Sequence, residues 1–557
     1  MSKFSSETAH RAATAPTPTT RTFEGAPAYE RTAKWDLFLL GAVNMVGEGT
    51  FYEKATDRDD RYRALVHQVT VLDPDWVTNY VRYLRGQLNM RSAAVVAAAE
   101  SALARRNNRT ALPPHTTTTR HLVDAALLRA DEPAEFLAYW IAATGSRTLP
   151  GGVQRGLADA VVRLFTQRAA LKYDGGSRGV RMGDVIELVH PMPKDDGQSA
   201  LFRWLLDRRH HPATIRADLT KLNVVSARAR LTERVQENRD EVLAGESAAD
   251  ELRAAGMTWE TLAGTGKMDA AAWEAQIPSM GVLALIRNLR NFDQAGISDD
   301  AARAVANALT NPALVRVSRA FPFRFLTAYL NAPSVRWSLP LEVALDLSTG
   351  NLPAFDGRTL VLVDTSASME ALLTDRSARR RPDQAEPARP RLVDVGALFG
   401  VALARKAVAA GGQVDLFGFA DSVFVHAIPK APGTTLRTVE SFRSRIGEVG
   451  HGTRIDVALK LWDKHDRVVL FTDMQTHGFT ETWGNSYGFT QAHRGGDLTA
   501  HIPASVPVFG VNLAGYAPTI VPPGGRMRFE LGGFSDATFT QMSLLERAGA
   551  GRWPWEE

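Results

Sequence analysis

The chain has 557 residues, of which 45% are hydrophobic and 23% are charged, and its formal net charge is +4. Single hydrophobic cores stop growing at roughly 250–300 residues, so this length excludes a one-domain protein, and the composition excludes a wholly disordered one. The small net charge excludes a highly basic chain, so binding to nucleic acid would need a local basic patch. The absence of cysteine excludes disulfides and thiolate metal sites, and it favours a reducing compartment.

The N-terminal residues are rich in Ser, Thr, Ala and Pro and lack the apolar core of a secretory signal. We interpret residues 1–25 as a disordered tail. No stretch of about 18 consecutive apolar residues occurs along the chain, so we expect neither a membrane span nor a membrane partner. These features predict a cytoplasmic location.

Residues 26–350 are expected to form one helical domain. Asp73 and Pro74 offer a helix cap and a first-turn proline, and apolar residues then recur at helical spacing from Val77 to Leu88. The same pattern predicts helices at residues 92–106, 135–143, 153–168, 183–189, 199–207 and 281–292. Pairs of helices joined by short turns bury their apolar faces only against neighbouring pairs. The pattern therefore favours an α-solenoid or a helical repeat ring, although no strict repeat period is found.

Residues 356–557 have a different pattern, which predicts an α/β domain. Short runs rich in Val, Leu and Phe predict strands at residues 358–363, 413–419, 422–425, 467–471 and 507–512, and helices are expected between them at residues 393–410 and 455–462. This alternation is typical of a doubly wound, mostly parallel sheet. Residues 372–391 form an arginine-rich interruption, which we interpret as a mobile insertion. It is either a solvated loop or a basic finger that touches nucleic acid or a partner.

Polar side chains follow the first predicted strand of this domain. Asp364, Ser366 and Ser368 alternate along the chain, so one carboxylate and two hydroxyls can face a common point. Thr453 precedes a predicted helix and Asp473 follows a later strand, and both can reach the same edge of the sheet. An all-oxygen set suits a hard divalent cation, Mg²⁺ or alternatively Mn²⁺, with hydroxyls binding it directly and carboxylates acting through water.

This ordered set of five residues resembles the metal-ion-dependent adhesion site (MIDAS) of von Willebrand factor A domains. Enzymatic alternatives lack the residues they need. Phosphoryl transfer on Asp364 would require a second Asp two residues on, where the chain has Ser366, and no phosphate-binding P-loop motif occurs. We therefore predict no catalytic residue and no enzyme activity.

A long helical domain followed by this α/β domain resembles the TROVE-domain family, which contains the Ro autoantigen and its bacterial orthologues. The similar segments are residues 47–52 (GEGTFY), 88–92 (LNMRS), 183–190 (GDVIELVH), 286–289 (IRNL), 322–325 (PFRF) and 362–369 (LVDTSASM). The resemblance implies a ring of HEAT-like repeats. Its outer face would bind small noncoding Y RNA, and its central hole would accept single-stranded ends of misfolded RNA.

RNA binding requires Lys and Arg to neutralise phosphates. The resemblance maps Lys172, Arg178 and His190 onto the Y RNA-binding face, and other basic residues lie in the same stretch, beside a Pro-Gly-Gly turn or on a predicted helix face. The full set of candidates is Arg147, Arg155, Lys172, Arg178, Arg181, His190 and Arg287. For each arginine, the alternative is a solvated charge or a weak ion pair. For His190, the alternative is a residue that interacts with a helix C-terminus.

The favoured function is that of a noncatalytic RNA-binding protein that scaffolds a ribonucleoprotein for RNA quality control or degradation. By resemblance, its partners would be Y RNA, misfolded or single-stranded RNA and, through the RNA, an exoribonuclease such as polynucleotide phosphorylase. The alternative is a metal-dependent protein-interaction module that works with an ATPase or an assembly complex.

Overall fold

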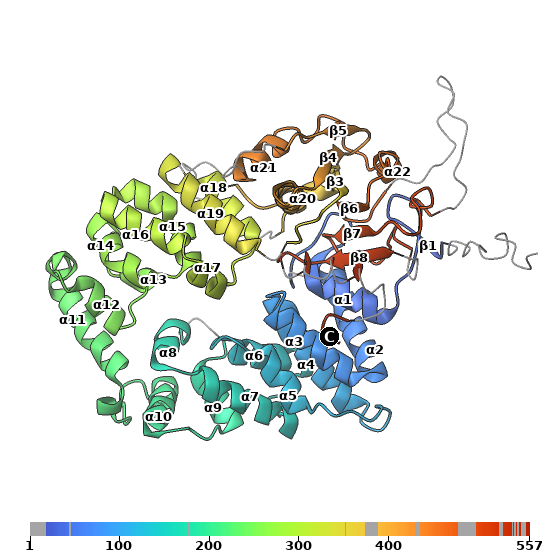
Figure 1. The fold of residues 1–557 in the computed structure, drawn as a ribbon. Helices are drawn as coiled ribbons and strands as arrows, with labels where there is room; N and C mark the ends of the chain where they lie inside the picture. The colour runs from blue at the N-terminus through green and yellow to red at the C-terminus, as the bar shows by residue number, and fades with distance from the viewer. Residues whose placement is uncertain are drawn as a thin grey trace, which may run out of the picture.

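A computed structural model describes residues 18–43, 46–175, 179–332, 334–350, 352–373, 388–428, 435–476, 497–522 and 527–536, together with short stretches between 538 and 556. The helices of the first 350 residues follow one another around an arc, and an α/β domain lies between the two ends of that arc (Figure 1). The predicted combination of a helical ring and a doubly wound α/β domain is therefore confirmed.

The helical part contains helices α1–α19. In the first half they are α1 (Ala33–Val43), α2 (Ala55–Leu72), α3 (Pro74–Gly86), α4 (Arg91–Asn107), α5 (Thr119–Ala126), α6 (Glu132–Thr144), α7 (Gly151–Leu164), α8 (Gln167–Tyr173), α9 (Met182–Val189) and α10 (Asp196–His210). In the second half they are α11 (Asn223–Ala244), α12 (Ala248–Ala254), α13 (Trp259–Ala263), α14 (Ala270–Gln276), α15 (Val282–Ala295), α16 (Asp299–Leu309), α17 (Pro312–Ser318), α18 (Pro322–Asn331) and α19 (Ser338–Ser348).

Helix α3 begins where the sequence predicts. The carboxylate of Asp73 accepts a hydrogen bond from the backbone N–H of Trp76 at 3.0 Å, and Pro74 occupies the first turn. The predicted apolar face, represented by Val77 and Leu84, is fully buried. The prediction of one continuous helix at residues 153–168 is wrong, because two helices, α7 and α8, occupy this range. Phe165 is extended, and the Thr166 side chain caps a separate helix, α8.

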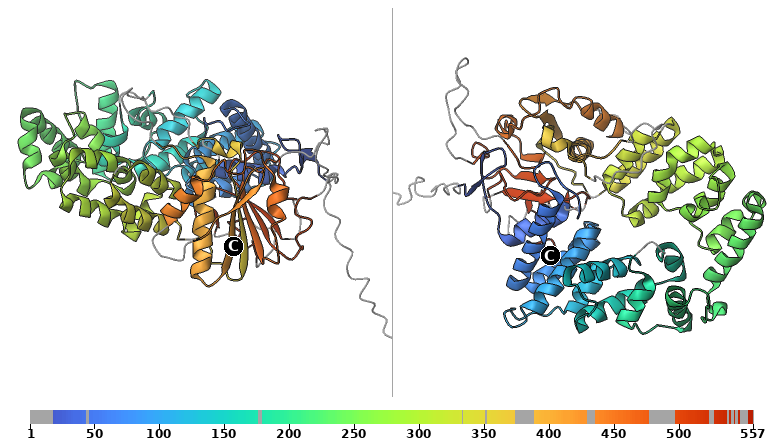
Figure 2. Two further views of the ribbon diagram at one scale, coloured as in Figure 1. Left: turned by 90° about the horizontal axis from the view of Figure 1, so that it is seen from above. Right: turned by 180° about the vertical axis from the view of Figure 1, so that it is seen from behind.

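The α/β domain contains a six-stranded sheet in the order β5-β4-β3-β6-β7-β8, in which only β5 is antiparallel to its neighbour. The strands are β3 (Arg358–Asp364), β4 (Gln413–Phe419), β5 (Val423–Val425), β6 (Arg467–Thr472), β7 (Val508–Asn512) and β8 (Arg528–Gly532). The helices are α20 (Leu392–Ala409), α21 (Thr435–Arg443) and α22 (Ile455–Leu459). Figure 2 shows α20 running alongside the sheet. The predicted strands are present, and β8 is an addition to them.

The first residues of the chain belong to the α/β domain in space. Strands β1 (Thr20–Arg21) and β2 (Pro27–Ala28) form a small hairpin, and Tyr29 pairs through its backbone with Thr519. Residues 18–25 were predicted as part of a disordered tail, and the structure corrects this, because long-range hydrogen bonds hold them on the α/β domain. Residues 1–17 lie outside the described residues, as do residues 374–387 of the predicted insertion.

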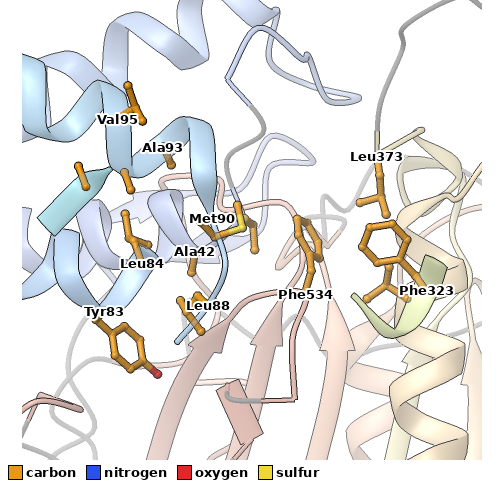
Figure 3. Close-up of a cluster of buried hydrophobic side chains, with 14 of the residues drawn as sticks. Ala42, Tyr83, Leu84, Leu88, Met90, Ala93, Val95, Phe323, Leu373 and Phe534 are labelled. Carbon is orange, nitrogen blue, oxygen red and sulfur yellow. The ribbon is translucent and has the colours of Figure 1, made fainter. Parts of the chain in front are cut away.

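Both ends of the helical arc contact the α/β domain. Helix α1 packs on β8 at one end, and α18 and α19 pack on α20 and α21 at the other. Phe534 fills part of this junction and is 1% exposed. Its ring lies between Met90 on one side and Phe323 and Leu373 on the other (Figure 3). The two domains therefore share a continuous apolar core.

The C-terminal residues return to the start of the helical arc. Trp553 packs against Trp76 with ring centres 4.9 Å apart, and Trp555 packs against Tyr83 at 5.7 Å. The C-terminus accordingly lies near α3 in Figure 1. Among the described residues, no helix has both the length and the apolar character needed to cross a membrane.

Candidate metal centre and nucleic-acid interface

The five predicted metal-site residues lie at the carboxyl edge of the sheet. Strands β3 and β6 are parallel neighbours in which Val363 pairs with Phe471, so Asp364 and Asp473 follow at adjacent strand ends. All five side chains are buried, with exposed fractions of 3% or less. The fold therefore places both predicted carboxylates at one edge, where open α/β sheets hold their ligands.

Asp364 organises the turn that carries the two serines. Its Oδ1 accepts the backbone N–H of Ser366 at 2.9 Å, and its Oδ2 accepts the hydroxyl of Thr472 at 2.6 Å. The hydroxyl oxygens of Ser366 and Ser368 lie 3.2 Å apart. Because both carboxylate oxygens of Asp364 already accept hydrogen bonds, the two serine hydroxyls are the better placed direct ligands for a cation.

The loop before α22 brings Thr453 to the serines. The backbone N–H of Ala367 donates to the carbonyl oxygen of His451 at 2.9 Å, and the hydroxyl of Thr476 donates to the carbonyl oxygen of Thr453 at 2.8 Å. Asp421 Oδ2 accepts the backbone N–H groups of residues 451 and 452. Asp421, Thr472 and Thr476 were not predicted, because their role depends on contacts between distant loops.

At this edge of the sheet, the carboxylate of Asp473 lacks one of its hydrogen-bond partners. Its Oδ1 accepts the backbone N–H of Gln475 at 3.0 Å, whereas its Oδ2 is buried without a hydrogen-bond partner. Burial, followed by repulsion from Asp364, raises the pKa of Asp473 to about 8, and burial raises the pKa of Asp364 to about 6. A divalent cation would relieve both effects, since it supplies the charge that two buried carboxylates lack.

The residues present therefore fit a hard cation. Within the described ranges, no group of three or more His, Asp or Glu side chains is arranged to hold a metal. A metal at this edge would consequently depend on the hydroxyls of Ser366, Ser368 and Thr453, as in the predicted donor set. When bound, the cation would supply a Lewis-acidic point charge that can attract an oxygen ligand.

The predicted RNA-binding residues are distributed along the helical arc. Arg147 and Arg155 are exposed at the turn before α7 and on α7, and Lys172 is exposed on α8. Lys172 Nζ lies 5.2 Å from the centre of the Tyr173 ring, and the guanidinium of Arg129 lies 5.4 Å from it. Two cationic side chains therefore lie close to the Tyr173 ring, and one of them, Arg129, was not predicted from the sequence.

Arg181 has a structural partner. Its guanidinium pairs with Asp174 at 2.7 Å, with the two side chains 13% and 1% exposed, and Asp174 also accepts the backbone N–H of Met182. This ion pair holds the start of α9. Arg181 thus forms an ion pair, as in the alternative that the sequence offered for each arginine, and its contact with RNA stays a prediction. Arg178 lies outside the described residues.

His190 ends α9 in a left-handed conformation, with φ of 47°, and its side chain is exposed. It lines a surface hollow of about 760 Å³ between α9 and α10, together with Met192 and Phe202. Met192 is 83% exposed. The hollow thus combines an exposed imidazole and an exposed thioether, and Phe202 beneath them is 5% exposed.

Arg287 lies on the other half of the arc, on the exposed side of α15. The guanidinium of Arg324, on the adjacent helix α18, has a pKa lowered first by burial and then by the charge of Arg287. These two arginines form a second basic position, separate in sequence from the one around α7–α9.

The fold and the site together define a class of protein in which a ring of paired helices is closed by an α/β domain with an all-oxygen polar cluster at its sheet edge. Comparison with known proteins agrees with this class. Residues 248–338, from α12 to the start of α19, match the TROVE domain family. Of the RNA-binding candidates, Arg287 lies within the matched segment.

Among solved structures, the chain is similar to the Ro (RSR) protein of Deinococcus radiodurans. The two share 19% sequence identity with a TM-score of 0.56, over 92% of this chain and 100% of that one. No curated protein sequence matches the chain. These comparisons confirm the predicted resemblance: residues 248–338 match the TROVE domain family, and 92% of the chain shares the fold of a bacterial Ro protein.

Proposed function

We propose that this protein is a noncatalytic RNA-binding protein that scaffolds a ribonucleoprotein. The observation that carries the proposal is the hollow beside His190, on a fold shared with a Ro protein. Sequence-specific RNA recognition uses unstacked bases, which stack on aromatic side chains and hydrogen-bond through their edges. His190 is an exposed ring that can stack on a base or hydrogen-bond to its edge, and Lys172 and Arg155 are exposed cations on neighbouring elements.

The proposed RNA ligand is a small structured RNA of the Y type, bound at α7–α10. Single-stranded ends of misfolded RNA are the proposed second ligand, and an exoribonuclease such as polynucleotide phosphorylase is a proposed partner that is tethered through the RNA. A cytoplasmic location fits these partners. The metal site at the sheet edge is proposed to bind Mg²⁺ or Mn²⁺.

Filter binding of a structured RNA at two salt concentrations tests the proposal. Lys172→Ala should weaken binding and reduce the slope of log affinity against log salt by about 0.7–0.9, the value for one lost phosphate contact. His190→Ala should weaken binding with less change in slope. Arg303→Ala is a matched control, because Arg303 is an exposed arginine that pairs with Asp300 on α16. Absence of RNA binding by the wild-type chain at low salt would refute the proposal.

A separate observation supports the alternative function, that of a metal-dependent protein-interaction module. The unpartnered Asp473 Oδ2 and the paired serine hydroxyls suit a cation that an acidic side chain of a partner could reach. Mg²⁺-dependent protein capture without any RNA affinity would support this alternative.

A further inference from the structure

A polar pocket of about 290 Å³ lies where the two ends of the helical arc meet the α/β domain. Its walls come from the end of α3, from α17 and the start of α18, from the end of α19 and from the loop after β8. Helices α3 and α17 belong to opposite ends of the arc (Figure 1). Small-ligand sites have volumes from roughly 300 Å³ upward and occur preferentially between domains, so the size and position of this pocket suit a small ligand.

Two arginines, Arg316 and Arg319, line the pocket, and both are exposed to solvent. Among the described residues, no carboxylate lies within ion-pair distance of either guanidinium. Arg319 Nη1 donates to the carbonyl oxygen of Arg85 at 3.5 Å, which is a long contact. Because a guanidinium has five N–H donors, most of the donors of both arginines remain available to a ligand.

The charges around the pocket favour an anion. One carboxylate, that of Asp536, lines the pocket beside the two arginines. A further cation lies behind the wall, since Lys406 Nζ donates at 2.7 Å to the carbonyl oxygen of Gly350, a residue of the lining. Three positive charges therefore face one negative charge.

Two polar atoms in the lining are buried without a hydrogen-bond partner. They are the hydroxyl oxygen of Ser535, a residue that is 5% exposed, and Oδ1 of Asn89. Buried polar groups in folded proteins nearly always have partners, so these two atoms point to a molecule in the pocket. A water molecule would satisfy the hydroxyl, but it would leave the charge of the arginines uncompensated. An anion satisfies both, because the Ser535 hydroxyl can donate to it.

A phosphate group fits these donors better than a carboxylate does. A phosphomonoester carries a charge of about −1.5 to −2 at neutral pH and has three strongly accepting oxygens. Arginine binds phosphate through its planar fork, with two parallel N–H···O bonds. The apolar part of the lining, which includes Pro312, Val315 and Leu347, can contact the rest of the molecule.

We propose that this pocket binds a small phosphomonoester, with Arg316 and Arg319 on the phosphate and Ser535 as a hydroxyl donor. The bound molecule contacts α3, α17 and the loop after β8 at once, so it holds the two ends of the arc against the α/β domain. This site is separate from the hollow beside His190 and from the proposed metal site. It goes beyond the proposed function, and the two are tested independently.

Calorimetric titration of the full chain at low salt with ribose 5-phosphate tests the proposal. Ribose 5-phosphate should bind, whereas ribose, which lacks the phosphate, should not. Arg316→Gln should weaken binding by about 10–100-fold, the loss expected for a charge-assisted hydrogen bond. Arg290→Gln is the matched control, because Arg290 is an exposed arginine on the adjacent helix α15 and lies outside the lining. Its affinity should equal that of the wild type.

Two further variants guard against a loss of binding through misfolding. Arg319→Gly removes the guanidinium at a residue whose φ is 50°, a conformation that glycine adopts without strain, and it should weaken binding as Arg316→Gln does. Ser535→Ala removes a buried hydroxyl that has no partner, so it should keep or raise the unfolding midpoint without ligand and still weaken binding. Unchanged affinity in all three variants would overturn the proposal.

Amide hydrogen exchange tests the link between the two ends of the arc. Ribose 5-phosphate should slow exchange in residues 86–90 and in residues 313–319, and Arg319→Gly should remove both effects. Slower exchange on one side only would contradict the bridging role.

The 5′ end of an RNA strand carries the same phosphomonoester, so a trinucleotide with a 5′-phosphate is compared with its 5′-hydroxyl form. A preference for the phosphorylated form that Arg319→Gly abolishes would identify an RNA end as the source of the phosphate. Binding of ribose 5-phosphate without that preference would identify a free molecule. If the wild type binds neither probe at millimolar concentration, or binds ribose as tightly as ribose 5-phosphate, the proposal is wrong.

Discussion

Arg31 and Glu530 form a two-pronged ion pair between the segment that enters the first helix and the last strand of the sheet. The guanidinium Nε and Nη2 lie 2.8 Å and 2.5 Å from the two carboxylate oxygens, and the side chains are 3% and 9% exposed. Nη1 of Arg31 also donates to the carbonyl oxygens of residues 516 and 517. One buried arginine thus connects the helical part to the α/β domain.

Replacing Arg31 by alanine should therefore destabilise the protein strongly. Removal of one partner from a buried ion pair leaves the other charge uncompensated and costs about 3–5 kcal/mol. The thermal unfolding midpoint, measured by calorimetry, should fall well below that of Arg82→Ala. Arg82 is an exposed arginine on α3, and its loss should change stability by no more than about 0.5 kcal/mol. Equal midpoints for the two variants would contradict the structural role of Arg31.

Phe534 should contribute in a different way, through packing. Truncation of a fully buried phenylalanine to alanine costs about 3–5 kcal/mol, because apolar contacts are lost and a cavity remains. Phe534→Ala should lower the unfolding midpoint and increase amide hydrogen exchange in α18, whose Phe323 faces Phe534 across the junction (Figure 3). Leu339→Ala, at a side chain that is 68% exposed, is the control and should do neither.

Arg181 and Arg155 should separate stability from RNA binding. Because Arg181 pairs with the buried Asp174, its replacement by alanine should cost about 1–3 kcal/mol of stability and loosen the start of α9. Arg155→Ala should leave the unfolding midpoint unchanged, weaken RNA binding at low salt and reduce the dependence of that binding on salt. Thermal melts and filter binding on both variants check this. An unchanged midpoint in Arg181→Ala would mean that the ion pair contributes nothing measurable.

The acidic edge of the sheet should make stability depend on pH and Mg²⁺ together. In the metal-free protein the pKa of Asp473 is raised from 3.8 to about 8, so the folded state keeps a proton that the unfolded state releases. The resulting stability is present below the unfolded-state pKa and is lost as the pH rises through the folded-state value. The melting temperature in chelator should therefore fall between pH 5 and pH 8.

Bound Mg²⁺ should replace that proton, so the stabilisation by Mg²⁺ should be larger at pH 8 than at pH 6. Asp473→Asn should flatten the pH dependence in chelator and reduce the Mg²⁺ effect. Asp463→Asn, at an exposed carboxylate near the opposite end of the sheet, should change neither. Scanning fluorimetry at the two pH values gives the comparison, and a Mg²⁺ effect that shrinks as the pH rises would contradict the assignment.

The sequence predicted an element correctly where its local pattern of apolar residues matches its burial in the fold. Strand β3 is a run of apolar residues that is buried along nearly its whole length, and its end at Asp364 was predicted to within one residue. The hairpin β1–β2 has strands of two residues, which carry no periodic signal, and it is held by distant partners such as Thr476. Its order could not be predicted, because hydrogen bonds that fix it come from distant residues such as Gln475 and Thr476.

Distant contacts also limited the prediction of β8 and of the candidate metal site. Strand β8 alternates charged and apolar residues, and Glu530 is acceptable in the sheet only because Arg31 and Asn512 pair with it. At the candidate metal site, the types of donor side chain and their order along the chain were visible in the sequence. The hydrogen bonds that orient them, including that of Thr472 to Asp364, depend on strand neighbours that only the fold defines.

The contact between Trp76 and Trp553 has a consequence for synthesis on the ribosome. Helix α3 emerges early, but the rings that cover its aromatic face belong to the last residues of the chain. At roughly 5–20 residues per second, translation of the ~480 residues between them takes on the order of half a minute to a minute and a half. During that interval the aromatic face of α3 is exposed, so we expect the nascent protein to need chaperones to avoid aggregation. A premature stop near the C-terminus would leave this face exposed in the finished chain.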